Sequence, residues 1–406
     1  MATTVRIIQR SKKTLSLVVD YGIDPVTKKR KKETRTLGTL DEQVAEAERL
    51  RVMAEIVEGS YKPSSRSTLG EYIDYWFTTP IAQKLDPKTR EHYKTLYDGR
   101  IKPWIGKKIL FDLTRDDLNN FYKKIIEVGH LDNLKPEKAG EPKKPKKPIT
   151  KSVIEHNHRF IRRILNHAKL EDEILKKNVA ERMVLPEPEP PDNYDPDEEL
   201  VKVFSQDEII KLEEKLIAEP HGPLVAVALR TGMRREELLA LTWDCIDEKE
   251  GTIFIKKALS VTKEKGYRIK PTKNKQKRKI EATPEILAAL DKQFKMQAVH
   301  RLRLGELYRK DLNLVFCAED GHYYHPNMPT RWFPAFCEEN GITRLTFHCL
   351  RHTHASHLLA SNEDISYVSK RLGHSNIVIT FDTYFHFIPK EKRKALAEFE
   401  KRLKKN

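Results

Sequence analysis

The sequence is poor in cysteine and has no long apolar run. Its 406 residues include only four cysteines, none of them in a CxxC pair: Cys245, Cys317, Cys337 and Cys349. This pattern excludes a disulfide scaffold or a zinc ribbon and suits a reducing cytoplasm. No segment reaches the roughly 20 apolar residues of a membrane span, and the start, MATTVRIIQRSKK, has no apolar centre typical of a secretory leader. We expect a soluble cytoplasmic protein with no membrane partner.

Acidic residues are also in deficit. The chain holds 76 Lys and Arg against 60 Asp and Glu, which gives a formal net charge of +16. An excess of this size favours a polyanionic partner, because basic side chains on phosphates release condensed counterions. A soluble protein that is merely basic is the alternative. The length favours two to four domains.

The N-terminal segment predicts a small basic sheet. β-Branched and apolar residues indicate strands over residues 5–9, 14–21 and 28–37, and helical spacing follows over 40–58. Residues 4–35 carry ten Lys or Arg and three Asp or Glu, a net of +7. A basic three-stranded sheet braced by one helix suits a DNA groove, and a solvated strand face is the alternative. We expect DNA contacts from a basic run in it: Lys28, Lys29, Arg30, Lys31 and Lys32.

A helical block follows over residues 67–185. Capping and spacing patterns predict five helices: 69–76, 87–100, 116–128, 152–168 and a short one near 172–177. The fourth carries a row of basic side chains that either meets phosphates or is solvated surface: His156, His158, Arg159, Arg162, Arg163 and His167. Arg159 and Arg162 are the DNA-binding candidates among them.

An acidic, proline-rich run over residues 187–199 (EPEPPDNYDPDEE) cannot form a packed core, so residues 186–200 are predicted to be a linker. Residues 201–406 then form a mostly helical domain, opened by a capping box of Ser205 and Glu208. A β-hairpin interrupts it, with one arm at 252–257 and a sheet continued by 267–270 and 278–282. The fold class is thus multidomain and mainly α, with small β elements.

Three segments of this last domain together suggest phosphate chemistry. They are Thr231–Leu238 (TGMRREEL), His348–His352 (HCLRH) and Leu372–His374 (LGH), and Tyr384 follows them. Two guanidinium groups can hold the non-bridging oxygens of a phosphodiester and neutralise developing charge. Histidine can exchange a proton near neutral pH, and a tyrosine hydroxyl can store the bond energy as a phosphotyrosine. Each piece alone is also common as surface charge or core.

The order and spacing of these segments resemble the tyrosine recombinase (phage integrase) family, most closely from about residue 200 onward. The resemblance implies an arm-type DNA-binding domain over 1–62, a helical core-binding domain over 67–185 and a catalytic domain over 201–406. It implies an enzyme that integrates and excises a mobile element through a 3′-phosphotyrosine, without a cofactor. It also implies a homotetramer on the core and arm attachment sites of double-stranded DNA, with an excisionase and a host DNA-bending protein as possible partners.

The same resemblance carries roles onto individual residues. By this resemblance, Arg234 and Arg351 hold the phosphate and His348 assists proton transfer. It also implies that His374 bonds the transition-state phosphate, that Tyr384 is the nucleophile and that Glu237 organises the site. The family's general acid is a hairpin lysine. Counting back from Ile280, Lys273 fits best and Lys275 is second. The remaining basic residues of that tract are expected on the DNA backbone: Lys275, Lys277 and Arg278.

Three alternatives stay open beside this interpretation. The histidines at 348, 352, 354 and 357 have spacings that suit zinc, but no Cys or carboxylate completes a tetrahedral set, so we expect no metal, and histidines 352, 354 and 357 are interpreted as helix-packing or DNA-facing residues. A type IB topoisomerase uses a similar residue set, and a DNA-binding regulator without enzymatic activity would share the charge. The sequence does not separate a prophage from a conjugative transposon. It also leaves open whether the amphipathic segment 390–403 docks on its own domain or on a neighbour.

Overall fold

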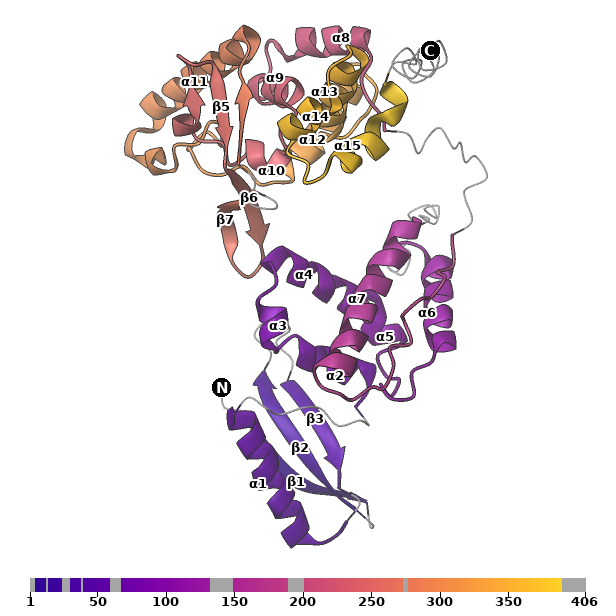
Figure 1. Cartoon of the computed structure of the whole chain (residues 1–406). Helices are drawn as coiled ribbons and strands as arrows, with labels where there is room; N and C mark the ends of the chain where they lie inside the picture. Colours follow the sequence, from indigo (N-terminus) through magenta and orange to yellow (C-terminus); the bar gives the residue numbers. More distant parts are fainter. Residues whose placement is uncertain are drawn as a thin grey trace, which may run out of the picture. The chain divides into compact units, whose positions relative to one another are not determined.

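The chain divides into two compact units, Met1–Asp192 and Asn193–Asn406 (Figure 1). The structure, a computed structural model, describes residues 4–11, 14–23, 30–37, 39–58, 67–131, 149–188, 201–272 and 277–388. Among these residues no helix is both long and apolar enough to cross a bilayer.

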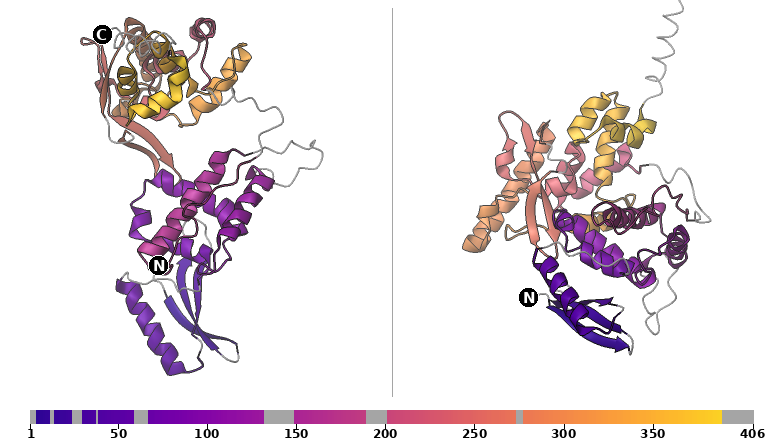
Figure 2. Two further views of the ribbon diagram at one scale, coloured as in Figure 1. Left: turned by 45° about the vertical axis from the view of Figure 1, so that its right-hand side comes forward. Right: turned by 60° about the horizontal axis from the view of Figure 1, so that its bottom comes forward.

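Unit 1 begins with a three-stranded antiparallel sheet in the order β1-β2-β3 (β1, Thr4–Ser11; β2, Thr14–Ile23; β3, Arg30–Thr36). Helix α1 (Glu42–Glu58) packs against this sheet (Figure 2). The contact is apolar, and its buried members are Val5, Leu17, Val19 and Val52. Pairing of Val5 with Val19 puts both side chains on the helix-facing side, since residues opposite each other share a face.

The rest of unit 1 is helical. Its elements are α2 (Leu69–Trp76), α3 (Pro80–Gln83), α4 (Pro87–Leu96), the π-helical turn η1 (Tyr97–Ile101), α5 (Lys102–Trp104), α6 (Arg115–Val128) and α7 (Lys151–Leu170). Capping boxes start α2 at Thr68 and α6 at Thr114, which satisfies backbone N–H groups that a helix start leaves unpaired. Large aromatic side chains fill the core between these helices, among them Tyr72, Trp76 and Phe160.

Two expectations for this helical part are wrong. No helix forms over residues 172–177, because the buried carboxylate of Asp172 accepts a hydrogen bond from Tyr72 (2.6 Å) and Glu173 takes a left-handed backbone conformation (φ 57°). His158 and His167 do not face phosphates either. Both are buried, His158 against the hydroxyl of Tyr122 (3.0 Å) and His167 against that of Tyr72 (2.8 Å).

Unit 2 holds helices around two small sheets. Its helices are α8 (Gln206–Leu216), α9 (Gly222–Thr231), α10 (Arg235–Leu238), α11 (Pro284–Leu304), α12 (Met328–Glu339), α13 (Cys349–Ala360), α14 (Ile365–Leu372) and α15 (Ile377–Tyr384), with 3₁₀ turns η4 (Trp243–Cys245), η6 (Gly305–Leu307), η7 (Lys310–Leu312) and η8 (Phe385–Phe387). The predicted capping box of Ser205 and Glu208 is confirmed at the start of α8. Helix α9 is largely buried and packs against both α11 and α13, so it forms the centre of this unit.

The strands of unit 2 do not make the single sheet that was expected. One sheet has the order β4-β5-β8 (β4, Ile246–Asp247; β5, Thr252–Ile255; β8, Arg278–Glu281). The hairpin is instead made of β6 (Lys257–Thr262) and β7 (Gly266–Pro271), and it projects from the body of the unit as a separate ribbon (Figures 1 and 2). Residue 256 separates β5 from β6, so the strand that was predicted as one arm is split between the two sheets.

Candidate active site

Arg234 stands at the sharp turn between α9 and α10. Helix α9 ends at Gly232, which has a left-handed backbone (φ 62°), and a Cβ there would come within 2.7 Å of the His354 ring and 2.9 Å of Leu372. Only glycine fits both the conformation and the space. The turn places Arg234 at the N-cap of α10, with its side chain about one quarter exposed.

Glu237 links two arginines below this turn. It is 2% exposed, accepts from Nη1 of Arg234 (3.0 Å) and from both terminal nitrogens of Arg278 (3.0 and 2.6 Å). Burial alone would raise the pKa of Glu237, but the hydrogen bonds and charge of Arg278, with that of Arg234, lower it below its usual value. Glu237 is therefore a buried carboxylate that holds Arg234 in place.

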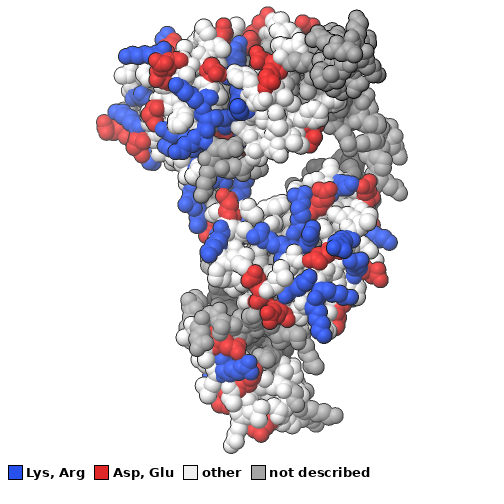
Figure 3. Space-filling view, viewed as in Figure 1, with Lys and Arg blue, Asp and Glu red and all other residues white. Residues whose placement is uncertain are grey.

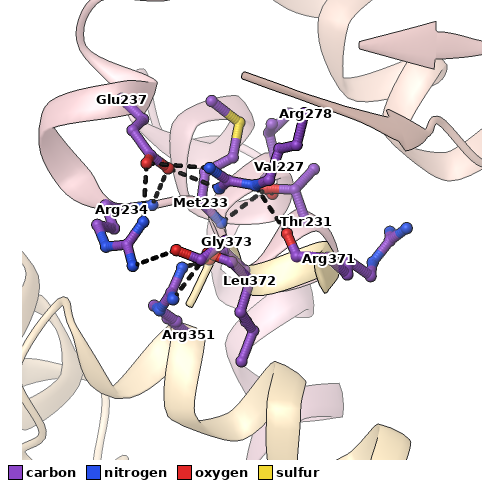
Figure 4. A network of polar contacts seen from close by, with 11 residues as sticks. Val227, Thr231, Met233, Arg234, Glu237, Arg278, Arg351, Arg371, Leu372 and Gly373 are labelled. Carbon is purple, nitrogen blue, oxygen red and sulfur yellow. Dashed lines mark hydrogen bonds and ion pairs between the residues drawn. The ribbon is translucent and has the colours of Figure 1, made fainter. Parts of the chain in front are cut away.

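Arg351 and Arg234 meet at one turn after α14 (Figure 4). Arg351 lies in the first turn of α13, is 3% exposed, and donates to the carbonyls of Gly232 (2.7 Å) and Leu372 (2.8 Å). Arg234 donates to the next carbonyl, that of Gly373 (2.8 Å). A guanidinium has five N–H donors, so these side-chain bonds to described residues use two on each arginine and leave three for an anion.

Arg351 stays cationic in this setting. Burial, with repulsion from Arg234, lowers the pKa of Arg351 to about 9, which is still above physiological pH. Two positive charges side by side, one of them buried, are costly without a partner. Glu237 compensates part of this charge, and an anion placed between the guanidinium groups would compensate the rest.

His374 follows directly on that turn. Its Nδ1 lies 2.7 Å from the hydroxyl oxygen of Thr380, a fully buried residue of α15. Burial, together with the charges of Arg351 and Arg234, lowers the pKa of His374 to about 4, so the ring is neutral at pH 7. A neutral imidazole held through Nδ1 presents Nε2 as its remaining polar atom.

Tyr384 ends helix α15 and is 1% exposed. Its ring packs in a small apolar cluster of α13 and α14 residues, among them Ala355, Leu359, Val368 and Leu372. Burial raises the pKa of the phenol to about 12, although Arg351 and Arg234 act in the opposite direction. The phenolic oxygen lies 2.8 Å from Nδ1 of His352.

His348 precedes α13 and is exposed at the rim of this group. Its ring meets that of His352 edge to face, with 4.7 Å between the centroids. Desolvation by the surrounding protein and the charge of Arg351 lower its pKa. The structure thus gathers six of the residues expected from the sequence. Arg234, Glu237 and Arg351 lie together, with His374 and His348 beside them, and Tyr384 joins them through its contact with His352.

Two residues of the site were not assigned to it from the sequence. His352 was interpreted as a packing or DNA-facing residue, and Arg278 as a DNA contact. The DNA-facing assignment of Arg278 is wrong, because its side chain is 9% exposed, paired with Glu237, and donates through Nε to the carbonyl of Arg371 (2.8 Å). The sequence gives no signal that separates Arg278 from the other basic residues of its tract.

The other DNA-binding candidates are divided between surface and undescribed residues. Arg159, Arg162 and Lys277 are exposed, Arg159 in an i, i+4 pair with Glu155. Lys32 lies 3.9 Å from Asp20. Outside the described residues, or with side chains outside them, lie Lys28, Lys29, Arg30, Lys31, Lys273 and Lys275. On the visible face, Lys and Arg gather on one side of unit 2 and spread, mixed with Asp and Glu, over the helical part of unit 1 (Figure 3).

Side chains of the types that bind metal ions are present in the part of the chain that the structure describes. There, no three His, Cys, Asp or Glu side chains come together in an arrangement that could hold a metal ion. The four cysteines are buried and unpaired. The arrangement that is present, two arginines with neutral imidazoles and a phenol, is suited to binding and attacking a phosphodiester.

Comparison with known proteins gives a consistent picture. A family model described as "Phage integrase family" matches residues 198–391, and one described as "Phage integrase, N-terminal SAM-like domain" matches residues 68–126. The chain is 26% identical over 348 residues to "Tyrosine recombinase XerC-like" of Caldanaerobacter subterraneus subsp. tengcongensis, covering 81% of this chain and 82% of that protein. It is 23% identical over 382 residues to "ICEBs1 integrase" of Bacillus subtilis, covering 94% and 95%.

A solved structure shares the fold. It is the Tn1549 transposon integrase in complex with a circular intermediate DNA, with a TM-score of 0.65 and 17% sequence identity, covering 82% of this chain and 99% of that chain.

Proposed function

This chain belongs to the phage integrase family of tyrosine recombinases and is a site-specific DNA recombinase, and we propose that it cuts and rejoins DNA through Tyr384. The observation that carries this assignment is the shared turn at Leu372 and Gly373. Both Arg351 and Arg234 are bonded to it, and His374 follows it in the chain. A phosphodiester bound to these arginines would lie beside the helix that ends in Tyr384.

The proposed reaction is a transesterification. The phenolic oxygen of Tyr384 attacks the scissile phosphorus while Arg234, Arg351 and His374 hold the non-bridging oxygens. These donors are fixed by the fold before DNA arrives, so little reorganisation is needed as negative charge develops. The product is a 3′-phosphotyrosine and a free 5′-hydroxyl. The 5′-hydroxyl of a partner DNA then attacks the phosphotyrosine, and the strands rejoin without ATP.

The leaving 5′-oxygen needs a proton, and a lysine is the proposed donor. Lys273 is the first candidate and Lys275 the second, both outside the described residues. Support for this tract comes from Arg278, the first residue of β8, which is bonded to Glu237 within the site. Lys273 precedes Arg278 by only five positions. His348, exposed at the rim, is proposed to assist proton transfer.

The remaining proposals concern assembly. Exchange between two duplexes requires cleavage of four strands, and one nucleophilic tyrosine per chain makes a homotetramer the natural unit. Residues 1–62 are proposed to bind arm sites and residues 67–185 core sites, with an excisionase and a host DNA-bending protein as possible partners. A mobile element, prophage or conjugative transposon, is the proposed substrate.

A suicide substrate tests the proposed chemistry. On a core site nicked next to the scissile phosphate, the freed fragment diffuses away, and a covalent protein–DNA adduct is expected to accumulate. Proteolysis of the adduct should leave the DNA on the peptide that contains Tyr384. Cleavage should proceed equally in EDTA, because the proposed phosphate donors are side chains. An adduct on another residue, or cleavage that stops without metal, would contradict the proposal.

Removal of residues 1–66 tests the arm-binding assignment. The carbonyl of Ser67 accepts from the backbone N–H of Leu110 (2.9 Å), so a protein beginning at Ser67 keeps its first contact with the helical part. It is expected to cleave core-site DNA normally but to lose arm-site binding and recombine intact partners poorly, because bridging two DNA sites supplies avidity. The isolated N-terminal fragment should bind arm DNA with a steep salt dependence. Full recombination by the truncated protein would refute the assignment.

A further inference from the structure

His352 is the residue that holds the phenolic oxygen of Tyr384. Nδ1 of His352 and the phenolic oxygen are 2.8 Å apart, and the two rings are tilted by 55° with centroids 5.7 Å apart. The residues come from different helices, α13 and α15, and 32 positions separate them in the chain. Their contact is therefore made by the tertiary packing of the site and not by local helix geometry.

The charge states of the two groups bear on the direction of this hydrogen bond. Burial raises the pKa of Tyr384 to about 12, so the phenol carries its proton at neutral pH. Burial, with the charges of His348 and Arg351, lowers the pKa of His352 to about 4, so its ring is neutral. The phenol therefore has a proton to donate, and Nδ1 can accept it in the tautomer whose ring proton resides on Nε2. In that tautomer the lone pair of Nδ1 points at the proton that the nucleophile has to lose.

The other imidazoles of the site are engaged differently. Nδ1 of His374 lies against the Thr380 hydroxyl, and the ring of His348 contacts His352 but has no hydrogen bond to the phenol among the described contacts. Arg351 and Arg234 act on the phenol only through their charge. His352 is thus the described side chain with a basic atom within hydrogen-bond distance of the phenolic oxygen.

We propose that His352 is a catalytic residue, the general base that takes the phenolic proton of Tyr384 during strand cleavage. This rests on the proposed role of Tyr384 as nucleophile. As the bond between the phenolic oxygen and phosphorus forms, the proton moves to Nδ1, and the bond between phosphorus and the 5′-oxygen breaks. The 5′-oxygen takes its proton from the general acid. On rejoining, Nδ1 returns its proton to the departing phenolate, so protons balance over the cycle.

The surrounding charges make this transfer depend on DNA. His352 contacts Tyr384 on α15, and burial and the charges of His348 and Arg351, both at its own helix, disfavour a protonated His352. Without DNA the proton therefore stays on the phenol, and the nucleophile is inactive. A phosphate bound to Arg351 offsets the charge of this arginine at the imidazole, and this favours protonation of His352 only when a substrate is present.

The test uses a nicked core site with sulfur in place of the scissile 5′-oxygen. A thiolate leaves without a proton, so the general acid no longer affects the rate, and the phenolic proton is the one left to transfer. The variant is His352→Asn, whose side-chain amide places a hydrogen-bonding atom near the position of Nδ1 but cannot take a proton. His357→Asn is the matched control, because His357 lies on the same helix and contacts the Phe204 carbonyl instead.

At saturating DNA and pH 7, His352→Asn is expected to cleave about 100-fold more slowly than wild type, the size of a lost general base. Its rate should rise with pH from 7 to 9 as solvent ionises the phenol, whereas the wild-type rate and that of His357→Asn should stay flat, because the pKa of His352 lies well below this range. The thermal unfolding temperature and the DNA affinity of the variant are measured to check that it is folded.

Two results would overturn the proposal. If His352→Asn cleaves at nearly the wild-type rate, a hydrogen-bond acceptor suffices and no base acts there. If it is slow with the wild-type pH profile, His352 only positions the phenol. Tyr384→Phe distinguishes failure of the His352 proposal from failure of the proposed nucleophile. An adduct formed by Tyr384→Phe refutes the role of Tyr384 itself. An inactive Tyr384→Phe together with a fully active His352→Asn refutes only the role of His352.

Discussion

Tyr384→Phe is expected to form no covalent adduct with a nicked core site while binding that site with nearly unchanged affinity. The substitution removes one oxygen, the atom that is proposed to bond to phosphorus. The ring remains and still fills the apolar cluster with Leu359 and Val368. The lost hydrogen bond to His352 costs about 1 kcal/mol of stability, too little to unfold the protein.

Tyr367→Phe is the matched control for this variant. Tyr367 lies on α14, and its hydroxyl bonds to Glu281 at the surface. Losing that oxygen should leave the yield of adduct unchanged, measured by gel retardation after denaturation in detergent. Adduct formation by Tyr384→Phe at any rate above background would show that another residue attacks the phosphorus.

The part of the site formed by residues close together in the sequence could be predicted, because helix geometry alone brings their side chains together. Arg234 and Glu237 are three positions apart across a helix start, and that spacing alone brings their side chains together. The same holds for the capping boxes, such as Ser205 with Glu208 at the start of α8. Contacts of this kind depend on the local backbone and not on tertiary packing.

Long-range pairings could not be predicted. Arg278 occurs in a tract so rich in Lys and Arg that the local sequence does not distinguish one basic residue from another. A DNA contact was therefore the natural interpretation. Which one turns inward depends on the pairing of β5 with β8, because Ile253↔Ile280 and Ile255↔Arg278 place position 278 next to Glu237 and Gly373. A one-residue change of register would have exposed it.

His352 illustrates the same limit for the catalytic histidines. The HCLRH segment contains two histidines, and the resemblance predicts the first as the one that assists proton transfer. Their difference lies in the face of α13 that meets α15, and no spacing within the segment reports the position of a helix that begins 25 residues after its last residue. The residue types that serve phosphate chemistry were predictable, but the division of proton transfer between them was not.

Arg351→Ala is expected to raise the activation free energy of single-turnover cleavage by about 3 kcal/mol, which slows cleavage roughly 100-fold or more, and to weaken DNA binding much less. The rate falls because a charged, two-pronged donor is lost from the developing phosphate charge. Removing it also leaves the carbonyls of Gly232 and Leu372 without their described donor, so the turn that carries His374 loses one of its links to the end of α9. Affinity is largely spared, because many other basic residues supply the electrostatic attraction.

Arg351→Lys sharpens this test. A lysine keeps the charge, but its single ammonium cannot reproduce the fork that reaches Gly232 and Leu372 together. We expect its cleavage rate to lie between those of wild type and Arg351→Ala. Arg344→Ala, which removes an exposed arginine paired with Glu338, should cleave normally and serves as the control for loss of charge. Rates at saturating DNA and separate binding titrations distinguish the two effects. An affinity loss as large as the rate loss would identify Arg351 as a DNA-binding residue, and the two-arginine site described here would then not be the one that stabilises the transition state.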